Sequence, residues 1–267
     1  MATVQINGQE LAYRDTGGDG PAVVFMHGFL MDHTMFDAQI EALSGDFRCV
    51  AFDARGFGQT KWDGQAFSLY DTVADCLGLM DHLGIAQANI VGMSQGGYAA
   101  LRLALKHPDR LKSLVLMSTR SGADEEPVKE IYRQMRDTWA NVGPVDELLT
   151  GLLTSLLGPK EQVATHWNTW WPKAKGIPGT HIFAAMNNLI DRDDITDEQL
   201  KQIAVPVLVT HGTADEGMPI ALDQHLYETL PNAKGLVKIE GAAHIANMTH
   251  PEQVNPQLVE FLLQYGK

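Results

Sequence analysis

The chain has 267 residues, of which 45% are hydrophobic and 20% are charged, and its 33 acidic against 20 basic side chains give a formal net charge of −13. This excess of acid argues against nucleic acid or an anionic membrane as a partner, because binding their phosphates needs a clustered basic surface. The length fits one large domain, or one core with an insertion.

The cysteines and the N-terminal residues indicate the cellular compartment in which the protein resides. Cys49 and Cys76 are too few for a disulfide framework and lack zinc spacing, so we expect two buried thiols and no metal. No basic stretch followed by an apolar one opens the chain, and no apolar run reaches membrane-spanning length. We therefore expect a cytoplasmic monomer or homodimer that binds neither nucleic acid nor a membrane.

Short strands open the chain. Val4 and Ile6 alternate with polar residues, and the following Asn7-Gly8 pair predicts a hairpin turn. Continuous apolar runs come next, and such runs are typical of strands that are buried on both faces of a sheet. They lie at 22–26, 49–52, 90–91, 114–117, 207–209 and 236–239.

Segments with helical spacing separate these strands. Apolar residues recur every three or four positions in 69–83, 98–106 and 254–262. Strands that alternate with helices require crossover connections. The predicted fold class is therefore α/β, a mostly parallel sheet with helices on both faces.

One segment interrupts this alternation. From about Arg120 to Asp194 the pattern is helical, with no convincing strand. Such a segment either packs its aromatic side chains against the sheet or also covers a binding cleft, and the two roles are compatible. It holds four of the five tryptophans, Trp139, Trp167, Trp170 and Trp171, which are the candidate substrate-binding residues.

The strongest motif is Gly92-Met93-Ser94-Gln95-Gly96, which lies directly after the strand at 89–91 and before the helix at 98–106. A G-x-S-x-G sequence between a strand and a helix is typical of a nucleophile elbow, where a sharp turn presents the serine hydroxyl at a helix N-terminus. The alternative is a serine that caps an ordinary helix.

A serine hydroxyl needs a base and an orienting acid. Of the ten histidines, His244 lies in the loop after the last strand, at the strand ends where ligands bind. His250 is the nearest alternative, but it precedes a proline. Asp215 follows the strand at 207–210 and is the candidate acid, with the adjacent Glu216 left open. The order Ser94, Asp215, His244 is the one expected for a nucleophile elbow of this type.

Two backbone donors are needed for an oxyanion. One is the N–H of Gln95, directly after the candidate nucleophile. The other is the N–H of Phe29, in the loop His27-Gly28-Phe29-Leu30 after the strand at 22–26. The alternative for His27-Gly28 is a plain turn at the end of a strand.

A second glycine-containing loop, Asp53-Ala54-Arg55-Gly56-Phe57-Gly58, follows another strand. It either binds an anion or, as we expect, uses Arg55 to tie loops together. No G-x-G-x-x-G follows the first strands and no P-loop is present, so we expect no cofactor.

With these motifs in place, the sequence resembles the α/β-hydrolase superfamily, and in particular small bacterial carboxylesterases and enol-lactone hydrolases. The resemblance implies an eight-stranded sheet, with a core at 1–119 and 195–267 and a helical cap at 120–194. It gives Ser94, Asp215 and His244 the roles of the catalytic triad, and it gives the N–H groups of Phe29 and Gln95 those of the oxyanion hole.

Two features show which members of the superfamily this sequence does not resemble. The HGGG loop of hormone-sensitive-lipase-type enzymes is absent, and the nucleophile is a serine rather than the aspartate of haloalkane dehalogenases and epoxide hydrolases. The expected activity is hydrolysis of small to medium carboxylic esters through an acyl-enzyme. A lactonase, a carbon–carbon bond hydrolase and a non-catalytic receptor on the same fold are the alternatives. The expected partner is a small-molecule ester or lactone.

Overall fold

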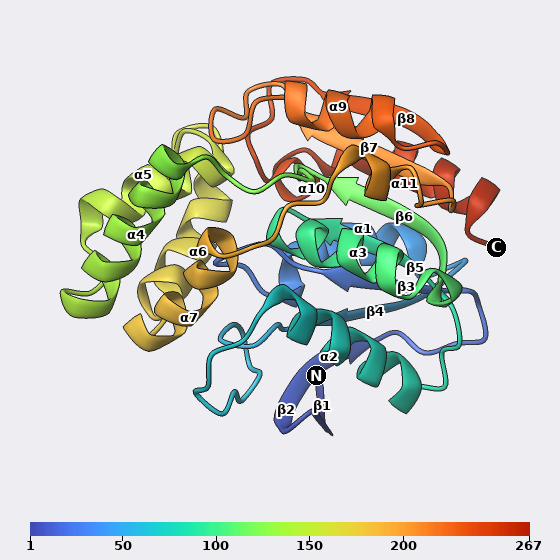
Figure 1. Cartoon of the computed structure of the whole chain (residues 1–267), viewed down its shortest axis with the longest axis horizontal. Coiled ribbons are helices and arrows are strands. Elements are labelled where there is room, and N and C mark those ends of the chain that lie inside the picture. The colour runs from blue at the N-terminus through green and yellow to red at the C-terminus, as the bar shows by residue number, and fades with distance from the viewer.

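Eight strands form one sheet in the order β1-β2-β4-β3-β5-β6-β7-β8 (Figure 1). The pairs β1–β2 and β2–β4 are antiparallel and all the other pairs are parallel. The predicted α/β class with a mostly parallel eight-stranded sheet is thus confirmed. In the computed structural model, which describes all 267 residues, the strands are β1 (Ala2–Ile6), β2 (Gln9–Asp15), β3 (Ala22–Met26), β4 (Arg48–Phe52), β5 (Ala88–Met93), β6 (Leu111–Met117), β7 (Val207–Gly212) and β8 (Ala233–Ile239).

Helices cover both faces of this sheet. On one face α2 packs against α3, and on the other α1 packs against α11, while α9 packs on β7 and β8 (Figure 1). The helices are α1 (Asp37–Leu43), α2 (Leu69–His82), α3 (Gln95–Lys106), α4 (Glu126–Asn141), α5 (Asp146–Leu157), α6 (Ala164–Lys175), α7 (Gly179–Ile190), α8 (Asp197–Leu200), α9 (Ala221–Thr229), α10 (Ala246–Thr249) and α11 (Pro251–Tyr265), with short 3₁₀ turns η1 (His33–Phe36) and η2 (Pro108–Arg110).

The central strands are apolar because they face helices on both sides. All residues of β3, β5 and β7 are buried, whereas the edge strands β1 and β8 are partly exposed. Continuous apolar runs therefore mark the middle of the sheet, and alternating runs mark its edge.

The segment between β6 and β7 contains α4, α5, α6 and α7 and no strand. These four helices form a group of their own beside the sheet, at the left of Figure 1. The hydrophobic core continues into this group, since Trp139, Leu149 and Ile182 belong to the same buried cluster as the sheet residues.

Cys49 and Cys76 are both buried and unpaired, as expected. Burial raises the pKa of each thiol to about 12. No helix has the length and apolar character needed to traverse a lipid bilayer.

Candidate active site

Ser94 occupies the turn between β5 and α3. Its backbone has φ 51° and ψ −115°, which is a strained conformation for a residue with a side chain. The turn is tight: a Cβ on Gly96 would collide with the carbonyl oxygen of Met26. Only glycine permits this approach of α3 to β3, and the result is a hydroxyl held at the N-terminus of α3.

His244 lies between Ser94 and Asp215. Its Nε2 is 2.9 Å from Ser94 Oγ, and its Nδ1 is 2.6 Å from Asp215 Oδ2. Because the carboxylate accepts a hydrogen bond from Nδ1–H, Nε2 keeps its lone pair for the serine hydroxyl. The structure therefore brings together three side chains that are remote in sequence, in the geometry of a proton relay.

The carboxylate of Asp215 is fixed by its own loop. Its Oδ1 accepts hydrogen bonds from the backbone N–H groups of Gly217 at 3.0 Å and Met218 at 2.9 Å, and the side chain is fully buried. Glu216 is exposed and makes no contact with His244. His250, the alternative base, pairs with the hydroxyl of its neighbour Thr249.

The loop after β3 lies directly against the nucleophile. A Cβ on Gly28 would meet Met93 Sδ at 2.8 Å and Ser94 Cβ at 3.4 Å. The next residue, Phe29, has a backbone N–H without an acceptor in the protein. The N–H of Gln95 lies in the first turn of α3, where such groups have no intrahelical acceptor. Both predicted oxyanion donors thus lie in segments that adjoin Ser94.

His27 fixes the backbone of this loop. Its Nε2 accepts a hydrogen bond from the Ala54 N–H at 2.9 Å, so the ring proton is on Nδ1, which donates to the Gly28 carbonyl at 2.8 Å. The same carbonyl accepts from the Met31 N–H at 3.2 Å. Since the Gly28 carbonyl and the Phe29 N–H belong to one peptide plane, these bonds set the direction of that N–H. Burial lowers the pKa of His27 and keeps the ring neutral.

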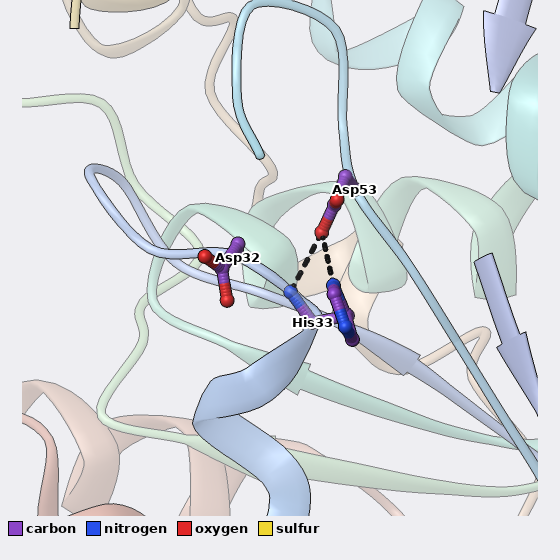
Figure 2. Close-up of side chains that lie close together, drawn as sticks. All are labelled: Asp32, His33 and Asp53. Carbon is purple, nitrogen blue, oxygen red and sulfur yellow. Dashed lines mark hydrogen bonds and ion pairs between the residues drawn. The ribbon is translucent and has the colours of Figure 1, made fainter. Parts of the chain in front are cut away.

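Asp32, His33 and Asp53 form a close cluster beside this loop (Figure 2). Asp53 Oδ1 accepts from both the backbone N–H and the Nδ1 of His33, each at 2.8 Å. Its Oδ2 accepts from the Gln59 N–H at 2.8 Å. The carboxylates already have donors, so the cluster is a hydrogen-bonded network and not an open set of metal ligands.

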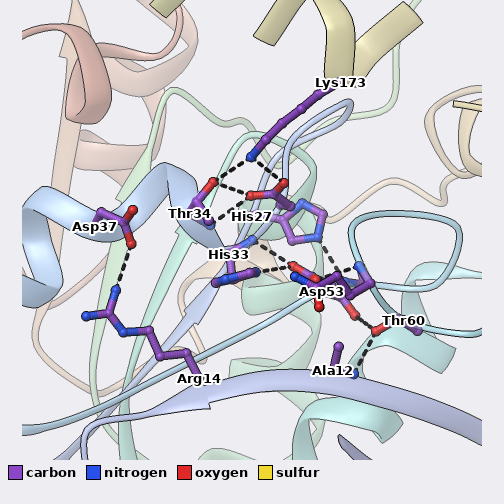
Figure 3. A network of polar contacts seen from close by, with 12 residues as sticks. Ala12, Arg14, His27, His33, Thr34, Asp37, Asp53, Thr60 and Lys173 are labelled. Carbon is purple, nitrogen blue, oxygen red and sulfur yellow. Dashed lines mark hydrogen bonds and ion pairs between the residues drawn. The ribbon is translucent and has the colours of Figure 1, made fainter. Parts of the chain in front are cut away.

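The network extends to the helices between β6 and β7 (Figure 3). Lys173 of α6 lies 2.8 Å from Asp32 Oδ2 and 2.9 Å from the hydroxyl of Thr34. At the other end, Thr60 accepts from the Ala12 N–H and donates to the backbone of Asp53. The sequence does not single out His33 or Lys173, because no local pattern joins partners so remote in the chain.

Arg55 has the structural role that we expected. Its guanidinium makes two contacts with Asp75 of α2, at 2.6 and 2.9 Å, and both side chains are buried. The loop after β4 is thereby tied to α2. Because the guanidinium of Arg55 is paired with Asp75, its charge is already neutralised within the protein.

The comparisons with known proteins agree with this fold. The family model described as the alpha/beta hydrolase fold matches residues 21–251. The chain belongs to the α/β-hydrolase family.

Other α/β-hydrolases show how varied the activities on this fold are. A non-heme chloroperoxidase from Streptomyces lividans is 30% identical over 283 aligned positions, which cover 98% of this chain and 99% of that protein. A thermophilic esterase from Thermogutta terrifontis has a TM-score of 0.90 at 29% identity, with all of both chains covered. The enol-lactonase from Burkholderia xenovorans LB400 has a TM-score of 0.88 at 26% identity, and 98% of this chain and 100% of that chain are covered. The fold therefore does not select the substrate.

Three of the four candidate tryptophans of this α/β-hydrolase make their contacts within the segment between β6 and β7. The buried indole of Trp139 donates to the Ile177 carbonyl at 3.3 Å, and that of Trp167 donates to the Gly158 carbonyl at 3.1 Å. Trp171 stacks on Trp167, with ring centroids 5.8 Å apart. None of these contacts reaches the Ser94 hydroxyl.

Trp170 is different, because it joins these helices to the core. Its indole N–H lies 3.0 Å from Met248 Sδ in α10. A second link is made by Ile245, directly after His244, whose N–H donates to the Leu156 carbonyl of α5 at 2.9 Å. The loop that carries His244 is thus in direct contact with α5 and α6.

Proposed function

We propose that this α/β-hydrolase cleaves carboxylic esters with small to medium acyl or alcohol groups through an acyl-enzyme on Ser94. The observation that carries the proposal is the unbroken contact from Ser94 Oγ through His244 to Asp215, at 2.9 and 2.6 Å. A strained serine at a helix N-terminus with an imidazole at hydrogen-bond distance is suited to acyl transfer.

In the proposed mechanism, Ser94 Oγ attacks the ester carbonyl while His244 Nε2 takes the hydroxyl proton. Asp215 stabilises the imidazolium that forms and holds the ring in place. The imidazolium then returns the proton to the leaving alcohol, which breaks the ester bond and leaves the acyl group on Ser94. A water molecule, deprotonated by the same Nε2, attacks this acyl-enzyme and releases the acid.

The oxyanion of each tetrahedral intermediate is stabilised by the N–H groups of Phe29 and Gln95. The free N–H of Phe29 and the position of Gly28 against Ser94 support this role. Because His27 fixes the Gly28–Phe29 peptide before substrate binds, little reorganisation accompanies the development of charge.

The four helices α4–α7 act in this proposal as a cap over the site. A groove of about 520 Å³ lies between them and the core. Leu30 and Met31 of the oxyanion loop and Trp170 and Ile177 of the cap line it together with polar residues such as Asp32 and Lys173, and no triad side chain is part of its lining. The groove gives open space beside the oxyanion loop, and Trp170 is the one candidate tryptophan that lines it.

The test is the hydrolysis of a series of nitrophenyl esters by the wild type and by Ser94→Ala. We expect kcat of the Ser94→Ala variant to fall on the order of 10⁴-fold or more, because the nucleophile is lost. The matched control is Ser44→Ala, which removes an exposed hydroxyl at the end of α1 and leaves the rate unchanged. A Ser94→Ala variant that retains activity within tenfold would contradict the proposed nucleophile.

A lactone substrate is the second candidate, and the similarity to the enol-lactonase favours it. The same residues open a cyclic ester, but the leaving alcohol then stays attached to the acyl group. Comparing kcat/KM for matched linear esters and lactones decides between the two. Labelling of Ser94 by an organophosphonate without turnover of any ester or lactone would instead indicate a receptor.

A further inference from the structure

A second histidine–aspartate pair lies behind the proposed triad and has no part in the mechanism above. His211 is in β7, and Asp223 is in the first turn of α9. His211 Nδ1 is 2.6 Å from Asp223 Oδ2, and both side chains are completely buried. Ionisable groups are rarely buried to this extent unless they are paired, so the pair has a specific role in this place.

The pair adjoins the acid of the triad. His211 Nε2 is 3.8 Å from Asp215 Oδ2, the same oxygen that contacts His244 Nδ1 at 2.6 Å. The other oxygen of Asp215 is occupied by two backbone N–H groups of its loop. His211 is therefore a second histidine, besides His244, whose ring lies next to the carboxylate of Asp215.

The direction of the His211 dipole does not depend on which member of the pair holds the shared proton. If Asp223 is ionised, His211 is an imidazolium and both of its nitrogens carry protons. If Asp223 is protonated, it donates to Nδ1, and the single ring proton is on Nε2. In both cases Nε2 carries a proton and lies 3.8 Å from Asp215 Oδ2, which is longer than a hydrogen bond and leaves an electrostatic contact.

Building on the serine-hydrolase function proposed above, we propose that His211 is a positioning residue that, anchored by Asp223, places its Nε2 beside Asp215 Oδ2 and keeps that carboxylate oriented toward His244. A buried carboxylate next to a base that becomes cationic needs compensating donors on every side. Three donors are supplied by the Asp215 loop and His244, and His211 adds an electrostatic contact at 3.8 Å that is not a hydrogen bond.

The test compares His211→Phe, which keeps the ring and removes both nitrogens, with His211→Gln, whose amide N–H reaches the position of Nε2. We expect kcat of His211→Phe to fall on the order of 10- to 100-fold with little change in KM, because the base is misplaced in the transition state. The His211→Gln variant should recover a large part of this loss.

The matched control is His225→Phe. His225 also lies in α9 and pairs with an aspartate, Asp197, at 2.9 Å, but both side chains are about half exposed. Its replacement should leave kcat and KM unchanged. Thermal unfolding of all the variants shows whether they are folded at the assay temperature.

The pH profile separates positioning from a purely structural role. The charged groups that face His211 are Asp223 from α9 and Asp215 from the loop after β7. Without the Nε2–H, the carboxylate of Asp215 is less neutralised and stabilises the His244 imidazolium more strongly. The acid limb of kcat/KM, which reports the base of the free enzyme, should therefore move to higher pH in His211→Phe.

The experiments distinguish a failure of the inference about His211 from a failure of the proposed function. If the folded His211→Phe variant keeps the wild-type kcat and acid limb while Ser94→Ala is inactive, the inference about His211 is wrong and the proposed function stands. If the folded His211→Gln variant loses as much activity as His211→Phe, the Nε2 donor is not what matters, and the inference is likewise overturned. If wild-type Ser94 is neither labelled by an organophosphonate nor needed for turnover, the proposed function itself fails.

Discussion

His27 shows how much the placement of one backbone N–H depends on a single side chain. Its two ring nitrogens have opposite roles, since one donates to the Gly28 carbonyl and the other accepts from the Ala54 N–H. The Leu30 residue in the same loop has a positive φ of 65°, which a residue with a side chain adopts at a cost. His27 therefore stabilises a loop conformation that is unfavourable on its own.

Substitution of His27 should distinguish these two hydrogen bonds. An asparagine amide reaches the position of Nδ1, so His27→Asn keeps the donor to Gly28, whereas His27→Gln keeps a group near Ala54. We expect kcat to fall roughly 10- to 100-fold in His27→Gln and less in His27→Asn, since loss of one oxyanion donor costs about 10²- to 10³-fold. Measurement of kcat on the best nitrophenyl ester checks this order, and equal losses would contradict it.

For individual residues, the sequence was most informative where a catalytic role also requires a particular backbone conformation. The turn at Ser94 needs glycines on both sides, and that requirement is visible in the motif itself. His244 and Asp215 could be chosen because both follow strands and so lie at one edge of the sheet. The pair of His211 and Asp223 could not be predicted, because a strand residue and a helix residue carry no local mark of their contact.

At the scale of secondary-structure elements, a buried ion pair joins the connections into and out of α4–α7. Asp124 lies just before α4, and Arg192 lies just after α7. Their side chains are 2.7 Å apart and almost fully buried. Arg192 also donates to the Leu189 and Gly122 carbonyls, so the two connecting segments are fastened to each other.

Breaking this pair from one side should destabilise the fold. In Asp124→Asn the Arg192 guanidinium stays buried without its charged partner, and we expect the free energy of unfolding to fall by about 3 kcal/mol. Urea denaturation measures the change. Asp146→Asn, which removes a pair between two largely exposed side chains at Lys175, should change the free energy by less than about 1 kcal/mol. Similar losses in both variants would contradict the assigned role of burial.

The elements themselves were largely predictable, since the period of the apolar residues changes between strand and helix along the chain. The prediction that the segment from Arg120 to Asp194 lacks strands agrees with the four helices found there. The packing of these helices was not predictable. Contacts such as Trp170 with Met248 join residues whose separation in sequence is set only by the complete fold.

For the whole molecule, the pair of His33 and Asp53 makes stability depend on pH. Burial alone would lower the pKa of His33, but the hydrogen bond and the charge of Asp53 outweigh it and raise the pKa above 6.5. Burial likewise opposes ionisation of Asp53, but His33 and the backbone donors lower its pKa below 3.8. The His33 contribution is complete below pH 6.5 and is lost as the pH rises through the raised pKa. The Asp53 contribution is present above pH 3.8 and is lost in acid.

The stabilisation should therefore be largest at about pH 5 to 6 and should weaken at alkaline pH. We expect the difference in unfolding free energy between the wild type and His33→Gln to shrink as the pH is raised from 5.5 to 9. Urea denaturation at a series of pH values measures it, with the exposed His225→Gln as the control. A difference that stays constant over this range would show that the charge on His33 does not contribute.

The place at which the chain leaves the sheet for α4–α7 has a consequence for the design of new variants. The strand before this excursion, β6, and the strand after it, β7, are hydrogen-bonded neighbours, with Leu114 opposite Val207 and Met117 opposite Thr210. The excursion therefore interrupts no strand pairing, and the segments that lead into and out of the four helices are joined by the contact between Asp124 and Arg192. A module from another family member can be grafted between these two strands without re-registering the sheet. Under the function proposed above, such a graft would exchange the cap that adjoins the substrate groove, while Ser94, Asp215 and His244 stay in the recipient scaffold.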